Sequence, residues 1–289
     1  MEIQIPLVLF TSFLAWSIGA FVTQCILSLK GEGKQLQIIV LITSVVLLAI
    51  GGISVTFHLT HVFNLFNGFG HITSGITQEL IGIVILVIVM VLYFLMARRS
   101  EDASVPKWLA IVGIVVSIIL LIAMGHSYMM VSRPAWDSVL QLLSLFGGAC
   151  VLGPATVAVI AAIKGVEIPS IGKLNVVGSI VNAVLTVAYL VAMQVSSSTL
   201  QSFAYYFDPT HPNYAVKSAS DASLFSGDCV AFTILTILGL IVAVVAAYMG
   251  KKSGDWKKWG IVVIVAGLVC VVALRIAMYV MGASYFMVY

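Results

Sequence analysis

Residues 57–80, "FHLTHVFNLFNGFGHITSGITQEL", gather groups that can exchange protons near neutral pH. They include three of the five histidines, His58, His61 and His71, together with Glu79, and they contain no Lys or Arg. Histidine titrates near neutrality, and a carboxylate that is partly removed from water can do so too. If His58 and Glu79 converge in an apolar pocket, they suit a quinol: one group accepts a hydrogen bond from a ring hydroxyl, and the other carries the proton away.

The same stretch offers little for a metal or a haem. His58 and His61 have H-x-x-H spacing, but no further ligands accompany them. The four cysteines form no C-x-x-C motif, which argues against a cysteine-held cluster or a c-type haem. A b-type haem needs two facing histidines within the membrane, and only His58 and His126 qualify, both at helix ends. We therefore expect no haem or metal in this chain, and His61 and His71 are interpreted as loop residues.

The elements that must position these groups are membrane-spanning helices. Of the 289 residues, 61% are hydrophobic and 9% are charged, which excludes a soluble globular domain. Runs of about 20 residues are continuously apolar rather than alternating, so they predict helices and not barrel strands. We expect one all-α integral membrane domain, residues 1–289, with eight transmembrane helices. The predicted ranges are Pro6–Leu29, Gln37–Phe57, Thr77–Ala97, Lys107–Met129, Trp136–Ile163, Leu174–Val195, Asp228–Tyr248 and Lys257–Met281.

Three segments have features of their own. The first range lacks a basic flank and is expected to be a retained helix, not a cleaved signal. The fifth is longer than a membrane requires, and Pro154 within it predicts a tilt or a kink. The longest connection, residues 196–228, is Ser-rich at its ends and aromatic in its middle. It fits either an interfacial aromatic belt or a docking surface for another subunit.

The basic residues predict the orientation of these helices. The connections after the first, third, fifth and seventh ranges hold eleven Lys and Arg, whereas the opposite connections hold only Arg133 and Lys217. Because basic loops stay in the cytoplasm, we expect both termini on the outer, non-cytoplasmic side.

This orientation places five ionisable groups in the outer leaflet, although each costs about 2.5–3.5 kcal/mol to insert. They are His58, Glu79, His126, Arg275 and Asp228. Structural roles are open for each of them. Glu79 fits the first turn of a helix capped by Thr77, Arg275 fits an ion pair with Asp228 or Glu79, and the two histidines fit helix ends near water.

Several motifs together resemble the dimethyl sulfoxide reductase membrane-anchor subunit family (DmsC). They are "HLTHVFNLFN" followed by "ITQE", "SYMMVSRPAW" followed by "FGGACVLGP", and the closing "ALRIAMYVMG". The resemblance spans the whole chain and rests on their order and spacing. The chain departs from the family in "THV" after the first His-Leu, where a Gly-Ser-Pro-like turn is common, and in Asn64, where a basic residue is common.

The resemblance implies a haem-free anchor in the bacterial cytoplasmic (inner) membrane. Such an anchor docks a four-cluster iron–sulfur subunit and a molybdopterin catalytic subunit, oxidises menaquinol for them, and binds no nucleic acid. The functional His and Glu of the family fall on His58 and Glu79. We expect menaquinol to be oxidised there, with Tyr128, Arg275 and His126 around the quinol. A polytopic transporter and a purely structural anchor without a quinol site remain alternatives.

Overall fold

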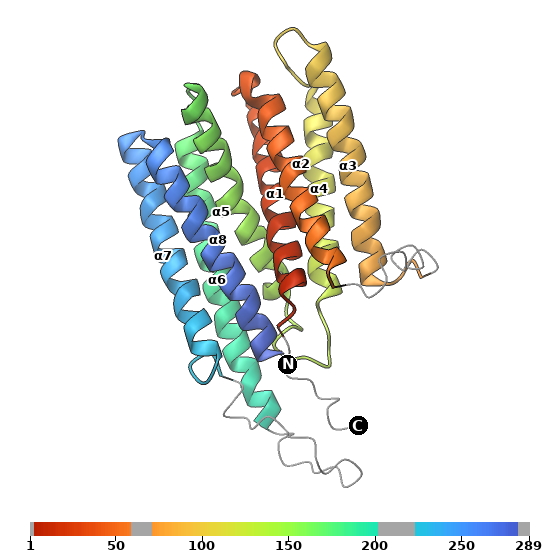
Figure 1. The fold of residues 1–289 in the computed structure, drawn as a ribbon, viewed down its shortest axis with the longest axis vertical. Coiled ribbons are helices and arrows are strands. Elements are labelled where there is room, and N and C mark those ends of the chain that lie inside the picture. The colour runs from red at the N-terminus through yellow and green to blue at the C-terminus, as the bar shows by residue number, and fades with distance from the viewer. Residues whose placement is uncertain (1–2, 59–70, 202–222, 283–289) are drawn as a thin grey trace.

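The computed structural model describes residues 3–58, 71–201 and 223–282, and these residues form eight α-helices and no strand (Figure 1). The helices are α1 (Ile5–Lys30), α2 (Gln37–Thr56), α3 (Gly75–Arg99), α4 (Lys107–Ser127), α5 (Val139–Lys164), α6 (Ile171–Gln201), α7 (Cys229–Ser253) and α8 (Trp256–Met281). Each is long and apolar enough to cross a membrane. The predicted all-α fold with eight spanning helices is confirmed.

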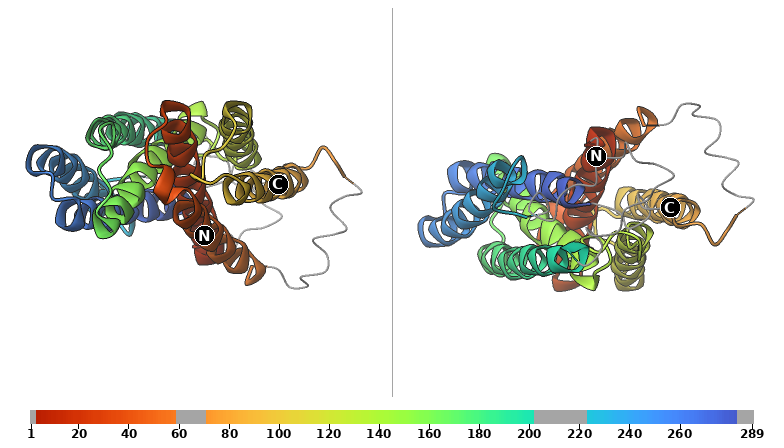
Figure 2. Two further views of the ribbon diagram at one scale, coloured as in Figure 1. Left: turned by 90° about the horizontal axis from the view of Figure 1, so that it is seen from above. Right: turned by 90° about the horizontal axis from the view of Figure 1, so that it is seen from below.

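The helices run alternately in opposite directions, so the start of α1 and the end of α8 lie at the same end of the bundle (Figure 1). The other end holds the short connections 31–36, 100–106, 165–170 and 254–255 with their flanking Lys and Arg, and we call it the basic end. Seen along the helices, α6, α7 and α8 form one side of the bundle and α3 and α4 the other, with α1 and α5 between them (Figure 2).

The central contact between α1 and α5 depends on two glycines. A Cβ atom on Gly19 would lie 2.2 Å from the carbonyl oxygen of Ala149, and one on Gly153 would lie 2.2 Å from the carbonyl oxygen of Gly19. Real side chains do not come this close, so only glycine lets the two backbones touch. Small residues allow this kind of close packing between membrane helices.

α5 remains helical on both sides of Pro154. Proline cannot donate to the carbonyl four residues earlier, which is that of Cys150. α6 packs directly on this carbonyl, because a Cβ on Gly178 would lie 2.0 Å from the Cys150 oxygen. The Asn175 side chain also donates to the carbonyl of Pro154, at 3.2 Å. The neighbouring helix therefore covers the site of the missing hydrogen bond.

The predicted ends of α6 and α7 are wrong, because these helices run to Gln201 and Ser253 instead of Val195 and Tyr248. Two smaller differences, at the end of α4 and the start of α5, lie near the site. α4 ends at Ser127 instead of Met129, which leaves Tyr128 at its C-cap. α5 begins at Val139 instead of Trp136, because the Ser138 hydroxyl accepts from the backbone N–H of Leu140 and caps the helix. The indole of Trp136 is instead held by α8, through a 2.7 Å hydrogen bond to the carbonyl of Met278.

Candidate functional site

Glu79 is buried on α3 and is hydrogen-bonded to the Ser127 hydroxyl at the end of α4. Gly75, one turn earlier, permits this approach, since a Cβ there would lie 2.6 Å from the Cβ of Ser127. α3 begins at Gly75 after Ser74, so Thr77 is not its N-cap and Glu79 lies beyond the first turn. The capping role considered for Glu79 is therefore wrong, and its burial needs another explanation.

Tyr128 follows Ser127 directly and brings a phenol to the same place. Burial, and secondarily the nearby carboxylate of Glu79, hold the pKa of Tyr128 well above its ordinary value, so the phenol keeps its proton. Its ring packs against Trp136, which in turn packs edge-on against Tyr279 of α8 at 5.1 Å. The Tyr279 hydroxyl interacts with that of Tyr128, but not in the geometry of a regular hydrogen bond.

Arg275 of α8 is the largest fully buried side chain among the described residues, with an exposed fraction of 2%. It donates to the Ser144 hydroxyl at 2.9 Å and contacts the sulfur of Met278 at 3.5 Å. Within the described ranges no carboxylate lies within 4.0 Å of it, so neither of the ion pairs considered for it, with Asp228 or with Glu79, is formed. Its electrostatic neighbours are three phenols, those of Tyr189, Tyr128 and Tyr279.

Together Glu79, Ser127, Tyr128, Arg275 and Tyr279 form what we call the Glu79–Arg275 cluster. The two tyrosines link its ends, because each interacts electrostatically with both Glu79 and Arg275. The cluster joins α3, α4 and α8 at the end of the bundle opposite the basic end. A carboxylate, two phenols and an unpaired guanidinium in apolar surroundings can bind oxygen atoms and accept a proton.

The connection between α4 and α5 covers the cluster and caps the end of α8. Trp136 donates to the carbonyl of Met278, and a guanidinium nitrogen of Arg133 donates to the carbonyl of Gly282 at 3.2 Å. The Arg133 guanidinium also lies over the Trp136 ring, 4.5 Å from its centroid. One loop therefore donates hydrogen bonds to two carbonyls at the C-terminal end of α8.

Both predicted histidines are exposed, in contrast to the cluster. The Nδ1 atom of His58 pairs with the Gln4 side chain at 3.1 Å, so its hydrogen bond is to the start of α1 and not to Glu79. His126 lies next to Ser127 but its side chain faces outward. The structure thus brings together Glu79, Tyr128 and Arg275 of the five predicted site residues. His61 and the aromatic part of the 196–228 connection lie outside the described residues.

Sequence reasoning missed Ser127, Ser144, Tyr189 and Tyr279. One signal was present, because Tyr279 follows Arg275 by four residues and so shares its helix face. The remaining three depend on how helices distant in the sequence meet. Among the described residues, no three His, Cys, Asp or Glu side chains group closely enough to hold a metal ion.

The fold and the cluster define a multi-pass helical membrane protein with a buried ionisable site at one end. Residues 171–273 match the model of a family described as "Protein of unknown function (DUF4064)". The matched segment runs from the start of α6 into α8, covers less than half of the chain and stops before Arg275. No curated protein matches the chain.

Proposed function

We propose that the chain is the membrane-anchor subunit of a molybdopterin oxidoreductase complex of the dimethyl sulfoxide reductase type. In this proposal it oxidises menaquinol at the Glu79–Arg275 cluster and passes the electrons to a four-cluster iron–sulfur subunit, which serves a molybdopterin catalytic subunit. The supporting observation is Glu79 itself, a buried carboxylate that interacts with two phenols. The same phenols interact with Arg275, a guanidinium that has no carboxylate partner among the described residues. Burying such groups in a membrane is costly, and a site that binds a quinol explains why they are together.

The proposed reaction balances within the complex. Menaquinol loses two electrons and two protons and becomes menaquinone, and the electrons leave to an iron–sulfur centre of the partner subunit. Glu79 accepts one hydroxyl proton, and the other passes through water to His58, which is exposed outside the cluster and exchanges it with the outer solution. Tyr128 and Arg275 hold the ring oxygens by hydrogen bonds. A phenol and a guanidinium can both donate hydrogen bonds.

The orientation is part of the same proposal. The Lys and Arg at the basic end favour the cytoplasmic side of a bacterial inner membrane, which puts the Glu79–Arg275 cluster in the outer leaflet. Since no redox centre is expected in this chain, the iron–sulfur subunit must dock close to the cluster, on the outer side.

The test is Glu79→Gln in the assembled complex. We expect menaquinol-driven reduction of the terminal acceptor to fall about a hundredfold, the usual scale for losing a general base. Reduction driven by a viologen dye, which bypasses the anchor, should keep its rate. The matched control is Glu101→Gln, an exposed loop change at the basic end. His58→Ala should also slow the quinol-driven rate.

Full menaquinol-driven activity in both the Glu79→Gln and the His58→Ala complexes would overturn the quinol site. Loss of the partner subunits from the membrane, with the Glu101→Gln control intact, would instead support the purely structural anchor.

A further inference from the structure

α6 carries a row of buried polar side chains on one face. They recur at alternating spacings of four and three residues, which keeps them on the same side of a helix. The row, which we call the α6 polar stripe, consists of Asn175, Ser179, Asn182, Thr186 and Tyr189, and each is at most 1% exposed. At 1.5 Å per residue the stripe extends about 21 Å along the helix axis, a large part of the hydrocarbon thickness of a membrane.

The stripe faces α5 and α8. Asn175 donates to the carbonyl of Pro154 in α5, and the Asn182 amide contacts the Cys270 sulfur of α8 at 3.8 Å. Thr186 bonds back to Asn182 at 3.5 Å. At the end of the stripe farther from the basic end, Tyr189 donates to the carbonyl of Ala135 and lies within electrostatic range of Arg275. The stripe therefore reaches the Glu79–Arg275 cluster.

Several buried polar atoms along this path have no hydrogen-bond partner within the described part of the protein. They are Asn175 Oδ1 and Ser179 Oγ on the stripe, followed by Gln141 Oε1, Arg275 Nε and Tyr279 Oη at the cluster. An unsatisfied buried group costs about 1–3 kcal/mol, so proteins normally supply a partner. Buried water commonly fills this role, making two to four hydrogen bonds to groups of this kind.

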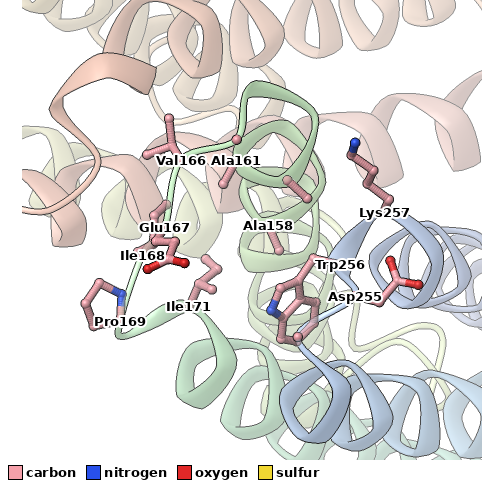
Figure 3. A pocket seen from close by; sticks show the side chains of 13 residues that line it. Ala158, Ala161, Val166, Glu167, Ile168, Pro169, Ile171, Asp255, Trp256 and Lys257 are labelled. Atoms are coloured by element: carbon pink, nitrogen blue, oxygen red, sulfur yellow. The ribbon is translucent and has the colours of Figure 1, made fainter.

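The other end of the stripe, at Asn175, lies near the basic end of the bundle. A pocket of about 700 Å³ lies there, between the end of α5, the start of α6 and the start of α8. Figure 3 shows Asp255, Trp256 and Lys257 of the α8 start on one side, Glu167 of the α5–α6 connection on the other, and Ala158 between them. The three charged side chains are exposed, so water reaches this pocket.

The pocket adjoins the first member of the stripe through two of its lining residues. Ile171 lines the pocket, and its carbonyl accepts a 3.0 Å hydrogen bond from the Asn175 side chain, the first member of the stripe. Ala158 also lines the pocket, one helical turn after Pro154, whose carbonyl accepts the second hydrogen bond of Asn175. Water in the pocket is thus separated from the first unsatisfied atom of the stripe by about one helical turn, or roughly 5 Å.

We infer that the α6 polar stripe holds a file of water molecules that carries protons between this pocket and the Glu79–Arg275 cluster. Each water accepts a proton on its oxygen and releases another to the next, so nothing is oxidised or reduced along the file. The unsatisfied polar atoms and the pocket together support the water file. The source of its protons rests on the proposed function, in which menaquinol oxidation releases them at the cluster.

A dry stripe that only joins helices by hydrogen bonds is the competing explanation, since polar side chains often do this in membranes. It accounts for Asn175, whose amide group bonds to α5. It does not account for Ser179, which is fully buried and whose hydroxyl has no partner on the neighbouring helices in the described ranges.

Hydroxyl-radical footprinting of the full-length chain tests the water file, because the radicals form where water is and label the nearest side chains. We expect Cys270 and Tyr189 on the path to be labelled about tenfold faster than in an Asn182→Leu variant, in which an apolar side chain blocks the file. Thr233→Val, a buried change on α7 away from the stripe, should leave both labelling rates unchanged. If Asn182→Leu does not fold, Ser179→Val serves in its place.

Labelling of Cys270 and Tyr189 that is slow in the unaltered chain and unaffected by either stripe variant would overturn the water file. This result needs no quinol, so it is independent of the proposed function. In the assembled complex, Asn182→Leu should slow menaquinol-driven turnover several-fold and leave viologen-driven turnover unchanged. A labelled stripe whose blockage leaves the menaquinol-driven rate unchanged would overturn its role as a proton route.

Discussion

Glu79 of α3 and Ser127 of α4 are hydrogen-bonded to each other at the buried end of the site. α3 lies at the edge of the bundle and packs mainly against α4, so this contact helps to fix its position. The hydroxyl donates to one carboxylate oxygen of Glu79, Oε1, and the described side chains donate no hydrogen bond to the second oxygen. In the proposed function, that second oxygen is the one that accepts the quinol proton.

Ser127→Ala should destabilise the protein. The substitution removes a hydrogen bond from a buried carboxylate, which typically costs about 1–3 kcal/mol of unfolding free energy. We expect a lower midpoint of thermal unfolding for the purified chain. Ser132→Ala, a change in the neighbouring connection that removes no hydrogen bond from the described side chains, is the control and should keep the original midpoint. Equal midpoints for both variants would show that the Ser127 contact contributes nothing.

Arg275→Met should abolish menaquinol-driven turnover without lowering the stability of the protein. A buried cation without a carboxylate partner is costly, and apolar replacements at such sites are often neutral or stabilising. Ser144 keeps a partner after the change, because its hydroxyl also bonds to the carbonyl of Gln141 at 2.6 Å. We therefore expect an unchanged or higher unfolding midpoint, together with loss of menaquinol-driven turnover in the complex.

Arg275→Lys is the companion variant, which keeps the charge but loses the planar fork of donors. It should retain part of the menaquinol-driven turnover. A large destabilisation by Arg275→Met would mean that the guanidinium is chiefly a structural group.

The number and type of helices could be predicted from the chain because continuous apolar runs bounded by Lys and Arg have few alternatives in a membrane. Glu79 and Arg275 could be selected as well, since ionisable groups in such runs are rare. Trp136 was misplaced for a physical reason. Its apolar ring fits the start of a helix, but the hydrogen bond to Met278, 142 positions away, holds it in the connection.

The contacts within the site could not be predicted because they depend on how each helix is rotated about its axis. The row from Asn175 to Tyr189 is visible as a regular spacing, yet the spacing alone does not say whether that face meets lipid or protein. This face of α6 meets protein because Gly178 lies directly against the Cys150 carbonyl, which packs the face against α5.

Gly19→Ala should separate α1 from α5. The added Cβ would lie 2.2 Å from the Ala149 oxygen, and a backbone atom cannot move aside as a flexible side chain does. Overpacking of this kind costs about 1–3 kcal/mol or more, so we expect a clearly lower unfolding midpoint.

Gly52→Ala on α2 is the matched control, because no atom lies within 4 Å of its added Cβ. Alanine is the better helix former by about 1 kcal/mol, so that midpoint should stay or rise. The opposite ranking of the two variants would contradict the close contact.

Asp102→Asn should lower stability at neutral pH, and the loss should shrink in acid. Asp102 lies in the α3–α4 connection and pairs with Lys34 of the α1–α2 connection, so the pair ties two loops of the basic end together. Lys34 first, and then the hydroxyls of Ser100 and Ser104, hold the pKa of Asp102 well below its ordinary value. A depressed folded-state pKa stabilises the protein above the unfolded-state value of about 3.9, and this stabilisation is lost as the pH falls further.

The measurement is the difference in unfolding midpoint between the unaltered protein and Asp102→Asn. It should be constant from pH 7 to about pH 5 and narrow below about pH 4, where the unfolded chain takes up the proton. Because both side chains are about half exposed, the difference should be small and should decrease in high salt. A difference that persists unchanged in acid or in salt would show that Asp102 acts through its hydrogen bonds to Ser100 and Ser104 and not through its charge.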